Sequence, residues 1–140
     1  MSLLTAIDVN ASGLKAQRQR VEVSSANLAN SQTTRTEEGG PYRRKDVIFQ
    51  AVSFGNAFDA AARGLNGVEV IGVADDPAEF DRRYEPGHPD ADAEGYVAYP
   101  NVSAIEEMAN LVEASRSYEA NISAVNIIKT MITRTLEIGR

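Results

Sequence analysis

Apolar residues near the start of the chain recur at alternating steps of three and four, a spacing that places them on one face of a helix. Residues 2–30 contain one glycine and no proline, so nothing in this stretch interrupts a helix. This spacing is typical of a coiled-coil seam, in which polar members set register at some cost in stability. We predict a helix that ends near Thr33 and Thr34. Its seam residues are Leu4, Ile7, Ala11, Leu14, Arg18, Val21, Ser25 and Leu28.

The end of the chain carries a longer pattern of the same kind. Pro100 does not fit a helix interior, and Ser103 followed by Glu106 forms a capping box, so a helix is predicted to start there. No glycine or proline follows until Gly139. The seam residues are Met108, Leu111, Ser115, Tyr118, Ile122, Val125, Lys129, Ile132 and Leu136. Because Val112, Ile127, Ile128 and Met131 lie on other faces, this helix is expected to contact several neighbours.

Between the helices the pattern changes to short apolar runs bounded by turn residues. Strands are predicted at 46–52, at 67–73 and at 95–99, where Pro100 ends the last one. Residues 56–65 are rich in alanine and are ambiguous, with room for one or two helical turns. We find no internal repeat and no low-complexity segment.

These elements predict an α+β fold in which two long terminal helices pair as an extended, coiled-coil-like hairpin around a small β-rich insert. The expected boundaries are 1–34 for the first helix, 35–102 for the middle domain and 103–140 for the second helix. The helices would be roughly 40 Å and 55 Å long, whereas a compact chain of this size has a radius of gyration of about 14 Å. We therefore expect their excess apolar surface to meet other chains.

The composition of the chain argues against several classes of function. The chain of 140 residues has a net charge of −6 and a pI near 4.8, which argues against binding nucleic acid through a basic surface. Residues 31–102 carry all of this charge, because the two ends carry +1 and −1. The chain has no cysteine and one histidine, so disulfides, thiolate sites and most histidine sites are excluded. We expect no enzyme activity, no cofactor and no metal site.

Two loop features have residue types found in functional sites. Asp90, Asp92 and Glu94 have the spacing of the first ligands of an EF-hand, but Asn101 stands where the bidentate glutamate belongs. A solvated acidic turn is therefore expected instead of a calcium site. His88 has no orienting partner in the sequence and is expected to be a loop or surface hydrogen-bonding residue.

The basic run Arg43-Arg44-Lys45 borders the first predicted strand. It could bind an anionic surface on a partner, but three basic residues more often protect an exposed strand edge. Both interpretations remain open at this point.

The start of the chain does not resemble a secretory signal, because Asp8 ends the apolar run after Ile7. No stretch approaches the roughly 18 apolar residues of a membrane helix. Work outside the cytoplasm would therefore need a route without a cleaved signal.

Motifs at both ends resemble those of bacterial flagellar rod and hook proteins. At the start they are Ser12-Gly13-Leu14, Ala16-Gln17-Arg18, Ala26-Asn27-Leu28-Ala29-Asn30 and Thr33-Thr34. At the end they are Glu106-Glu107-Met108, the run from Ala114 to Asn121, and Thr135-Leu136.

Motifs in the middle are similar to those of proximal rod proteins, so the resemblance covers nearly the whole chain. They are Pro41 to Lys45, Asp76-Pro77, Glu85 to Pro89, Ala91-Asp92, Gly95-Tyr96-Val97 and Pro100-Asn101-Val102. Two positions depart from the family pattern: Thr34 stands where many relatives have proline, and Glu85 where they often have aspartate.

The resemblance implies a structural subunit of the proximal rod of the flagellar basal body. Such subunits leave the cytoplasm through the flagellar type III export apparatus and polymerise helically into the shaft that carries motor torque to the hook. The implied partners are copies of the chain, other rod proteins and the component that joins the rod to the MS ring, without nucleic acid or membrane insertion. An alternative is a soluble coiled-coil adaptor or export chaperone.

Assembly would use the faces of the two terminal helices. The residues expected at this interface are Leu4, Ile7, Leu14, Val21, Asn27, Leu28, Asn30, Met108, Leu111, Tyr118, Ile122, Val125, Ile128, Ile132 and Leu136.

Overall fold

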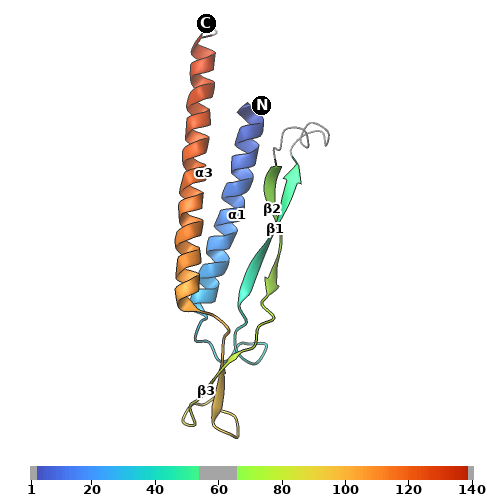
Figure 1. Cartoon of the computed structure of the whole chain (residues 1–140), viewed down its shortest axis with the longest axis vertical. Helices are drawn as coiled ribbons and strands as arrows, with labels where there is room; N and C mark the ends of the chain where they lie inside the picture. The colour runs from blue at the N-terminus through green and yellow to red at the C-terminus, as the bar shows by residue number, and fades with distance from the viewer. Residues whose placement is uncertain (1–2, 54–65, 139–140) are drawn as a thin grey trace.

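The computed structural model describes residues 3–53 and 66–138. Helices α1 (Leu3–Ala29) and α3 (Ala104–Ile138) run side by side along an elongated molecule (Figure 1). This arrangement confirms the predicted α+β fold with a helical hairpin and a small β-rich insert. The ambiguous residues 56–65 lie outside the described residues. The strands are β1 (Lys45–Ser53), β2 (Asn66–Asp75), β3 (Asp81–Tyr84) and β4 (Tyr96–Tyr99).

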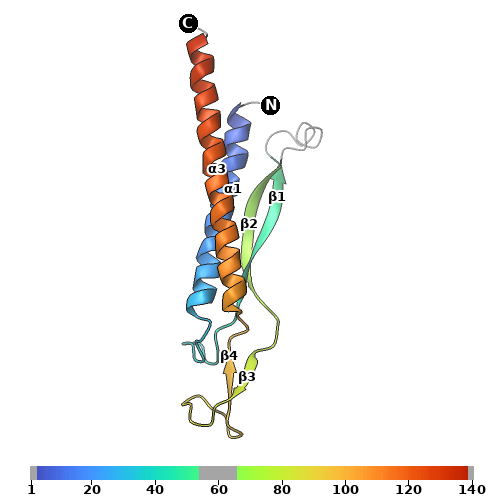
Figure 2. The same cartoon turned by 60° about the vertical axis from the view of Figure 1, so that its left-hand side comes forward.

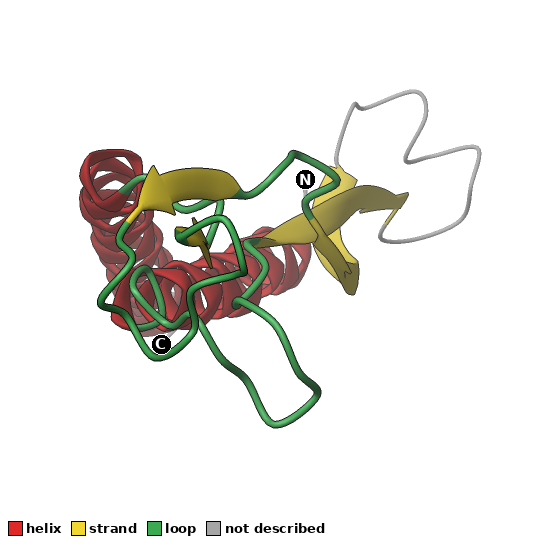
Figure 3. Cartoon of the chain, turned by 90° about the horizontal axis from the view of Figure 1, so that it is seen from below, coloured by secondary structure: helices red, strands yellow, loops and turns green. Residues whose placement is uncertain are grey.

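The molecule has three parts, of which α1 is the central one. The β1–β2 hairpin lies against one side of α1 and α3 lies against the other, while β3 and β4 extend past the helix ends (Figures 1 and 2). Viewed from below, the hairpin stands to one side of the helix pair (Figure 3). α1 is therefore covered from two directions, and α3 from one.

The predicted start of α3 is present, whereas α1 ends at Ala29, four residues before the predicted end near Thr33. The backbone N–H of Glu106 donates to Ser103 Oγ at 3.4 Å, so Ser103 is the N-cap of α3. α1 ends in a turn in which the N–H and the hydroxyl of Ser31 both donate to the carbonyl of Leu28. The chain then reverses, and the N–H of Tyr42 donates to the carbonyl of Thr33 at 2.9 Å.

The two helices approach each other closely because small residues lie between them. A Cβ atom built on Gly13 would lie 3.0 Å from Asn121 Nδ2, and Ala16 and Ala114 are buried. Arg20 forms an ion pair of 2.8 Å with Glu113. Gly13 opposite Asn121 and Arg20 opposite Glu113 set the antiparallel register of the pair.

The predicted seams are only partly the surfaces that the chain buries within itself. On α1, the seam residues Ala11, Arg18 and Ser25 are exposed, and Ser24 and Asn27 are buried instead. On α3, alternate seam residues turn outward, and the residue preceding several of them turns inward. The outward ones are Met108, Ser115, Ile122, Lys129 and Leu136, whereas Glu107, Ala114, Asn121 and Ile128 turn inward.

This correction has a physical cause. The spacing of apolar residues identifies the most apolar stripe of a helix. Two helices, however, approach most closely along their smallest residues, such as Gly13, Ala16 and Ala114. The contact is therefore rotated away from the apolar stripe, which leaves part of the stripe in solvent.

The β1–β2 hairpin is antiparallel and contains a bulge. Phe49 pairs with Val70 and Ile48 with Gly72, so Ile71 is the extra residue of the ladder. The N–H of Val68 donates to Ser12 Oγ at 3.1 Å, which ties β2 to α1. Two strands alone are marginally stable in water, so this contact with α1 supports the hairpin.

Only one strand of the β3–β4 pair, β4, was predicted. β4 follows the expected run before Pro100, but β3 was missed because Asp81-Arg82-Arg83-Tyr84 is polar and does not alternate. Tyr84 and Tyr96 pack edge to face across the pair, with ring centroids 5.3 Å apart. Gly95 has a φ of +85°, and a Cβ there would lie 2.9 Å from Tyr84 Cε2, so glycine is required.

Little apolar surface is fully buried. Among the described residues, the buried hydrophobic side chains are Ala16, Val97 and Ala114. The exposed surface of the chain is 9600 Å², whereas a compact monomer of 15.1 kDa would expose about 7,100 Å². Neither described helix is apolar enough over a sufficient length to cross a membrane. The chain thus has much more surface than a free globule of its mass.

Candidate assembly surface and polar junction

A polar junction joins the lower ends of the two helices to the start of β1. Asn27, on the last turns of α1, is 1% exposed. Its amide oxygen accepts from the N–H of Lys45 at 3.0 Å and from the hydroxyl of Tyr42 at 2.9 Å. Its amide nitrogen donates to the carbonyl of Lys45 at 2.8 Å. The side chain thus pairs with one residue of β1 as a neighbouring strand would.

Arg44 connects the remaining parts of the junction. Its Nε donates to Glu107 Oε1 on α3 at 2.7 Å, and its Nη1 donates to Asp46 and, at 3.2 Å, to Asp76. Its backbone N–H donates to Asn101 Oδ1 at 3.0 Å. Because Glu107 is 0% exposed, the guanidinium neutralises a carboxylate that water does not reach.

The charges of the junction shift the pKa values of its members. Partial burial of Arg44 disfavours its charge, but Asp46 and Glu107 outweigh this effect and raise the pKa of the guanidinium. The pKa of the Asp76 carboxyl is lowered, first by the backbone N–H of Ala78 and then by Arg44. Burial raises the pKa of Tyr42. These shifts favour a charged Arg44, an ionised Asp76 and a neutral Tyr42 hydroxyl near neutral pH.

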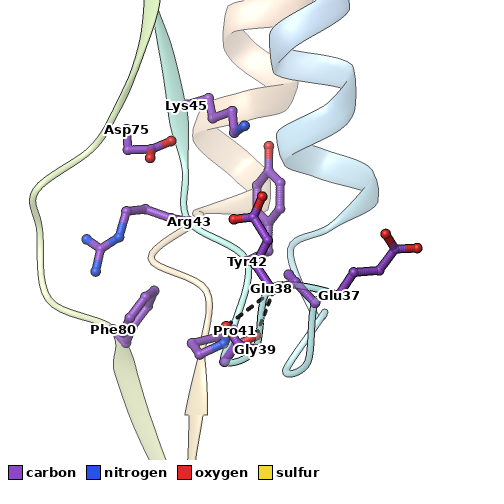
Figure 4. Close-up of a pocket in the computed structure, with 11 residues that line it drawn as sticks. Glu37, Glu38, Gly39, Pro41, Tyr42, Arg43, Lys45, Asp75 and Phe80 are labelled. Atoms are coloured by element: carbon purple, nitrogen blue, oxygen red, sulfur yellow. Dashed lines mark hydrogen bonds between the residues drawn. The ribbon is translucent and has the colours of Figure 1, made fainter.

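The three basic residues at 43–45 lie in different surroundings. Arg43 donates to the carbonyls of Asp76 and Ala78 and stacks on the ring of Phe80 at 4.3 Å (Figure 4). Arg44 points inward, and Lys45 starts β1. Neither sequence interpretation describes Arg44, since its guanidinium binds carboxylates of its own chain.

A hollow lies beside the junction, between the loop 36–41 and the end of β2 (Figure 4). Tyr42 points from this loop towards the helices, and Arg43 points the other way, beside Phe80. The lining combines Glu37 and Glu38 with basic and aromatic side chains and contains no convergent set of catalytic groups.

The acidic loop after β3 is tied to the rest of the fold. Asp90 accepts from Thr34 Oγ1 at 2.8 Å and pairs with Arg35 at 2.6 Å. Asp92 accepts from the N–H groups of Glu94 and Tyr96 and pairs with Arg82. The carboxylates therefore serve different internal partners and do not converge, and no metal-binding group of three or more such side chains occurs in 3–53 and 66–138.

His88 lies in the same loop, half-buried. Its Nδ1 accepts from the N–H of Asp90 at 3.1 Å. This is the loop hydrogen bond that the sequence led us to expect.

The residues expected at the assembly interface lie in different surroundings. Asn27 is inside the chain, and Asn30 makes local bonds to Ala26 and Thr33. The side chain of Leu4 is not described. Met108, Ile122 and Leu136 are exposed, whereas Ile7, Leu14, Val21, Leu28, Leu111, Tyr118, Val125, Ile128 and Ile132 are half-buried.

The outer faces of α3 are apolar to an unusual degree. Seven large hydrophobic side chains of this helix are at least 40% exposed, and Ile105 reaches 81%. The exposed positions of α1 are instead mostly polar or small, as at Lys15, Arg18 and Glu22. The seven are Ile105, Met108, Val112, Ile122, Ile127, Met131 and Leu136. Where these side chains adjoin one another, as at Met108 and Val112 and at Ile127 and Met131, the exposed apolar patch indicates a contact with another macromolecule.

Motifs that are far apart in the sequence meet at the polar junction. Asn27 belongs to the first helix motif, Arg44 to the run at 41–45, Asp76 to the Asp-Pro pair and Glu107 to the second helix motif. Sequence reasoning missed this site because the Arg44–Glu107 pair spans 63 residues and leaves no local pattern. One signal was available in the sequence: Glu107 is charged although it lies on the same helix face as the small residue Ala114.

Comparison with known proteins agrees with this architecture. The family model described as flagella basal body rod protein matches residues 7–35, which include all of α1 except its first four residues. The model described as the flagellar basal body rod FlgEFG protein C-terminal matches residues 93–138, which include β4 and α3. Both matched segments supply residues to the helix pair and to its junction.

Curated relatives match over full length. The flagellar basal-body rod protein FlgC of Escherichia coli O6:H1 is 45% identical over 140 residues, with all of both chains covered. The protein of that name from Bacillus subtilis is 44% identical, and all of both chains is again covered. That of Salmonella typhimurium is 43% identical over 141 residues, with the same full coverage. The chain therefore belongs to the FlgC family of flagellar basal-body rod proteins and is a structural subunit of that rod.

Proposed function

We propose that this chain polymerises helically into the proximal part of the rod, the drive shaft that carries motor torque towards the hook. The observation that carries the proposal is the unpartnered apolar surface of α3. The chain exposes about 2,500 Å² more than a compact monomer of its mass, which falls within the range buried by obligate interfaces. Copies of the chain and other rod proteins cover this surface.

The exposed and half-buried apolar residues of the predicted interface are the contacts in this proposal. They exclude Asn27, whose side chain is fully used within its own chain. The polar junction acts behind this surface and fixes the hairpin to the helices, so that load on the helices reaches the β-rich insert. Boundaries near residues 34 and 103 separate the helical ends from that insert.

Export through the flagellar type III apparatus without a cleaved signal is part of the same proposal. With so few buried apolar side chains, the isolated chain has little core to unfold before passage. The absence of cysteine means that no disulfide must form or break on the way. The further partners proposed are the export apparatus and the component that joins the rod to the MS ring.

Deletion of residues 2–30 tests the proposal. The shortened chain lacks α1, so α3 loses its internal partner and the predicted interface loses half of its residues. We expect normal synthesis in the cytoplasm, no incorporation into isolated basal bodies and loss of motility. The matched control is Glu22→Gln, an exposed change on α1 that should leave motility intact. Motile cells that carry the deletion as their sole copy would refute the proposal.

A further inference from the structure

Two apolar patches on α3 have the same layout at different places on the helix. The N-terminal patch consists of Met108 and Val112, with Ile105 beside them, and the C-terminal patch consists of Ile127 and Met131. Each patch forms a shallow hollow on the helix surface. All five side chains are more than 50% exposed, so neither patch is covered by the chain itself.

The separation of the patches is set by helix geometry. Met108 and Ile127 are 19 residues apart, as are Val112 and Met131. At 3.6 residues per turn and 1.5 Å per residue, the second patch lies about 28 Å further along the axis and about 100° around it. The two patches therefore face different directions, and one neighbour cannot cover both.

Opposite charge accompanies the two patches. The exposed charged residues of the helix are Glu106, Glu113, Arg116 and Glu119 from 104 to 121, and Lys129, Arg134 and Glu137 from 122 to 138. Glu107 does not contribute, because it is buried against Arg44. Arg134 borders the C-terminal patch. Glu113 borders the N-terminal patch together with Arg116, and its side chain stays 67% exposed although it pairs with Arg20.

We propose that the C-terminal patch of one copy docks on the N-terminal patch of a second copy. The inference rests on the proposed assembly of this chain and specifies which surfaces meet. Apolar side chains cover each other in this contact, and Arg134 of one copy approaches the acidic half of α3 in the next. A contact between two C-terminal patches would instead bring the two copies of Arg134 together, which disfavours it.

The docking of unlike patches has a geometric consequence. After two copies bind, one N-terminal patch and one C-terminal patch remain free at the ends of the pair. Further copies can therefore bind through the same contact. Because the patches are offset along and around the helix, successive copies are both shifted and rotated. Repeated contacts of this kind generate an open helical array rather than a closed pair.

Cysteine cross-linking tests the pairing directly, because the natural chain has no cysteine. The variant Val112→Cys/Met131→Cys carries one thiol in each patch and replaces the wild-type chain in cells. After mild oxidation of isolated basal bodies, we expect a ladder of disulfide-linked dimers and larger species under non-reducing conditions. The matched control Glu22→Cys/Met131→Cys moves one thiol to the exposed face of α1 and should give no ladder.

Other outcomes would overturn the inference. Dimers from either single-cysteine variant would show that identical patches meet. Products with the mass of this chain plus a different rod protein would assign the patch to that protein, and an incorporated double variant that forms no ladder would refute the contact. The pair Ala109→Cys/Ile127→Cys samples the same contact if the first variant is not incorporated, and absence of a ladder from both pairs would count against it.

The proposed function is tested separately by the same preparation. A tagged wild-type chain that is absent from isolated basal bodies would refute assembly itself. The same chain present there, without cross-links in the cysteine variants, would refute only the pairing.

Discussion

The two long helices of this molecule, α1 with 27 residues and α3 with 35, have opposite surroundings. α1 lies between α3 and the β1–β2 hairpin, and its buried positions are small or polar, such as Ala16, Ser24 and Asn27. α3 contacts α1 on one side, and its other faces hold seven exposed large hydrophobic side chains. α1 therefore serves the fold of the single chain, whereas α3 also presents surface for other chains.

The difference shows how one sequence separates two tasks. The close approach of α1 and α3 and the polar junction hold the single chain in shape with little apolar burial. Apolar surface therefore remains free for partners. If this division is correct, changes at α1 and the junction should lower the stability of the purified chain. Changes on the outer faces of α3 should leave that stability unchanged and reduce assembly.

Arg44→Ala should give the largest loss of stability. It removes the partner of Glu107, which is 0% exposed, and breaking a buried ion pair from one side costs about 3–5 kcal/mol. We expect the midpoint of urea unfolding, followed by circular dichroism, to fall towards zero denaturant. Arg43→Ala is the neighbouring control and should cost much less, because Arg43 bonds only carbonyls and stacks on Phe80.

The double variant Arg44→Met/Glu107→Leu completes this test. Removing both charges leaves no buried unpaired ion, because the side chains of Asp46 and Asp76, the other partners of Arg44, are 54% and 24% exposed. The double variant should therefore recover most of the stability lost in Arg44→Ala. A double variant as unstable as the single one would show that the pair is not the source of the effect.

Asn27→Ala should cost less than Arg44→Ala, about 2–3 kcal/mol, because it leaves the hydroxyl of Tyr42 and both backbone groups of Lys45 without their partner. Thermal unfolding of the purified chain measures the loss. Asn30→Ala is the control on the same helix end, and its local bonds should be worth under about 1 kcal/mol. Equal losses in the two variants would contradict the role assigned to Asn27.

Much of this fold was predictable from local signals. The helices, the Ser103 cap and three of the four described strands follow from spacing, capping and turn residues, which act over a few positions. The rod family and the absence of enzyme activity, both predicted from the motifs and composition, are confirmed by family membership. The same membership sets aside the alternative of a soluble adaptor or export chaperone.

The rest depends on contacts that leave no local pattern. The ion pair between Arg44 and Glu107 joins residues that are far apart in the chain, and Glu107 looked like an ordinary acidic residue of a first helical turn. The outward rotation of Met108 and Ile122 depends on where α1 docks, which Gly13 and Ala16 decide. Which of the predicted interface residues meet another chain stays a prediction.

Gly13→Leu tests the close approach of the two helices. A Cβ at this position would already lie 3.0 Å from Asn121 Nδ2, so a larger side chain must displace the Asn121 side chain or push α3 away. Overpacking of this kind costs about 1–3 kcal/mol, partly offset by the better helix propensity of leucine. Urea unfolding should show the loss, whereas Ala11→Leu, on the exposed face of α1, should be neutral. A stable Gly13→Leu chain would contradict the proposed packing.

Asp76 should make a small, pH-dependent contribution to the junction. Its pKa is lower in the folded chain than the ordinary value of about 3.9. The folded state therefore favours the carboxylate, and this stabilisation is present above the ordinary pKa and lost as pH falls through the lowered one. Between about pH 6 and about pH 3, the unfolding midpoint should fall less for Asp76→Asn than for the wild-type chain. An equal fall in both chains would exclude Asp76 as a source of the pH dependence.

Ile105→Asp should have the smallest effect on the stability of the purified chain and still disturb assembly. Ile105 is 81% exposed, so its loss from the monomer removes almost no burial, and surface changes of this kind stay within about 0.5 kcal/mol. It also lies in the first turn of α3, where a carboxylate suits the positive end of the helix dipole. Thermal unfolding should thus show an unchanged or slightly higher midpoint, while incorporation into basal bodies and motility fall. Ala11→Asp, at an exposed position within α1 and away from its ends, is the control that should assemble normally. If Ile105→Asp assembles as well as this control, the apolar end of α3 is not part of the rod interface, and the contrast between the two helices reduces to one of internal packing.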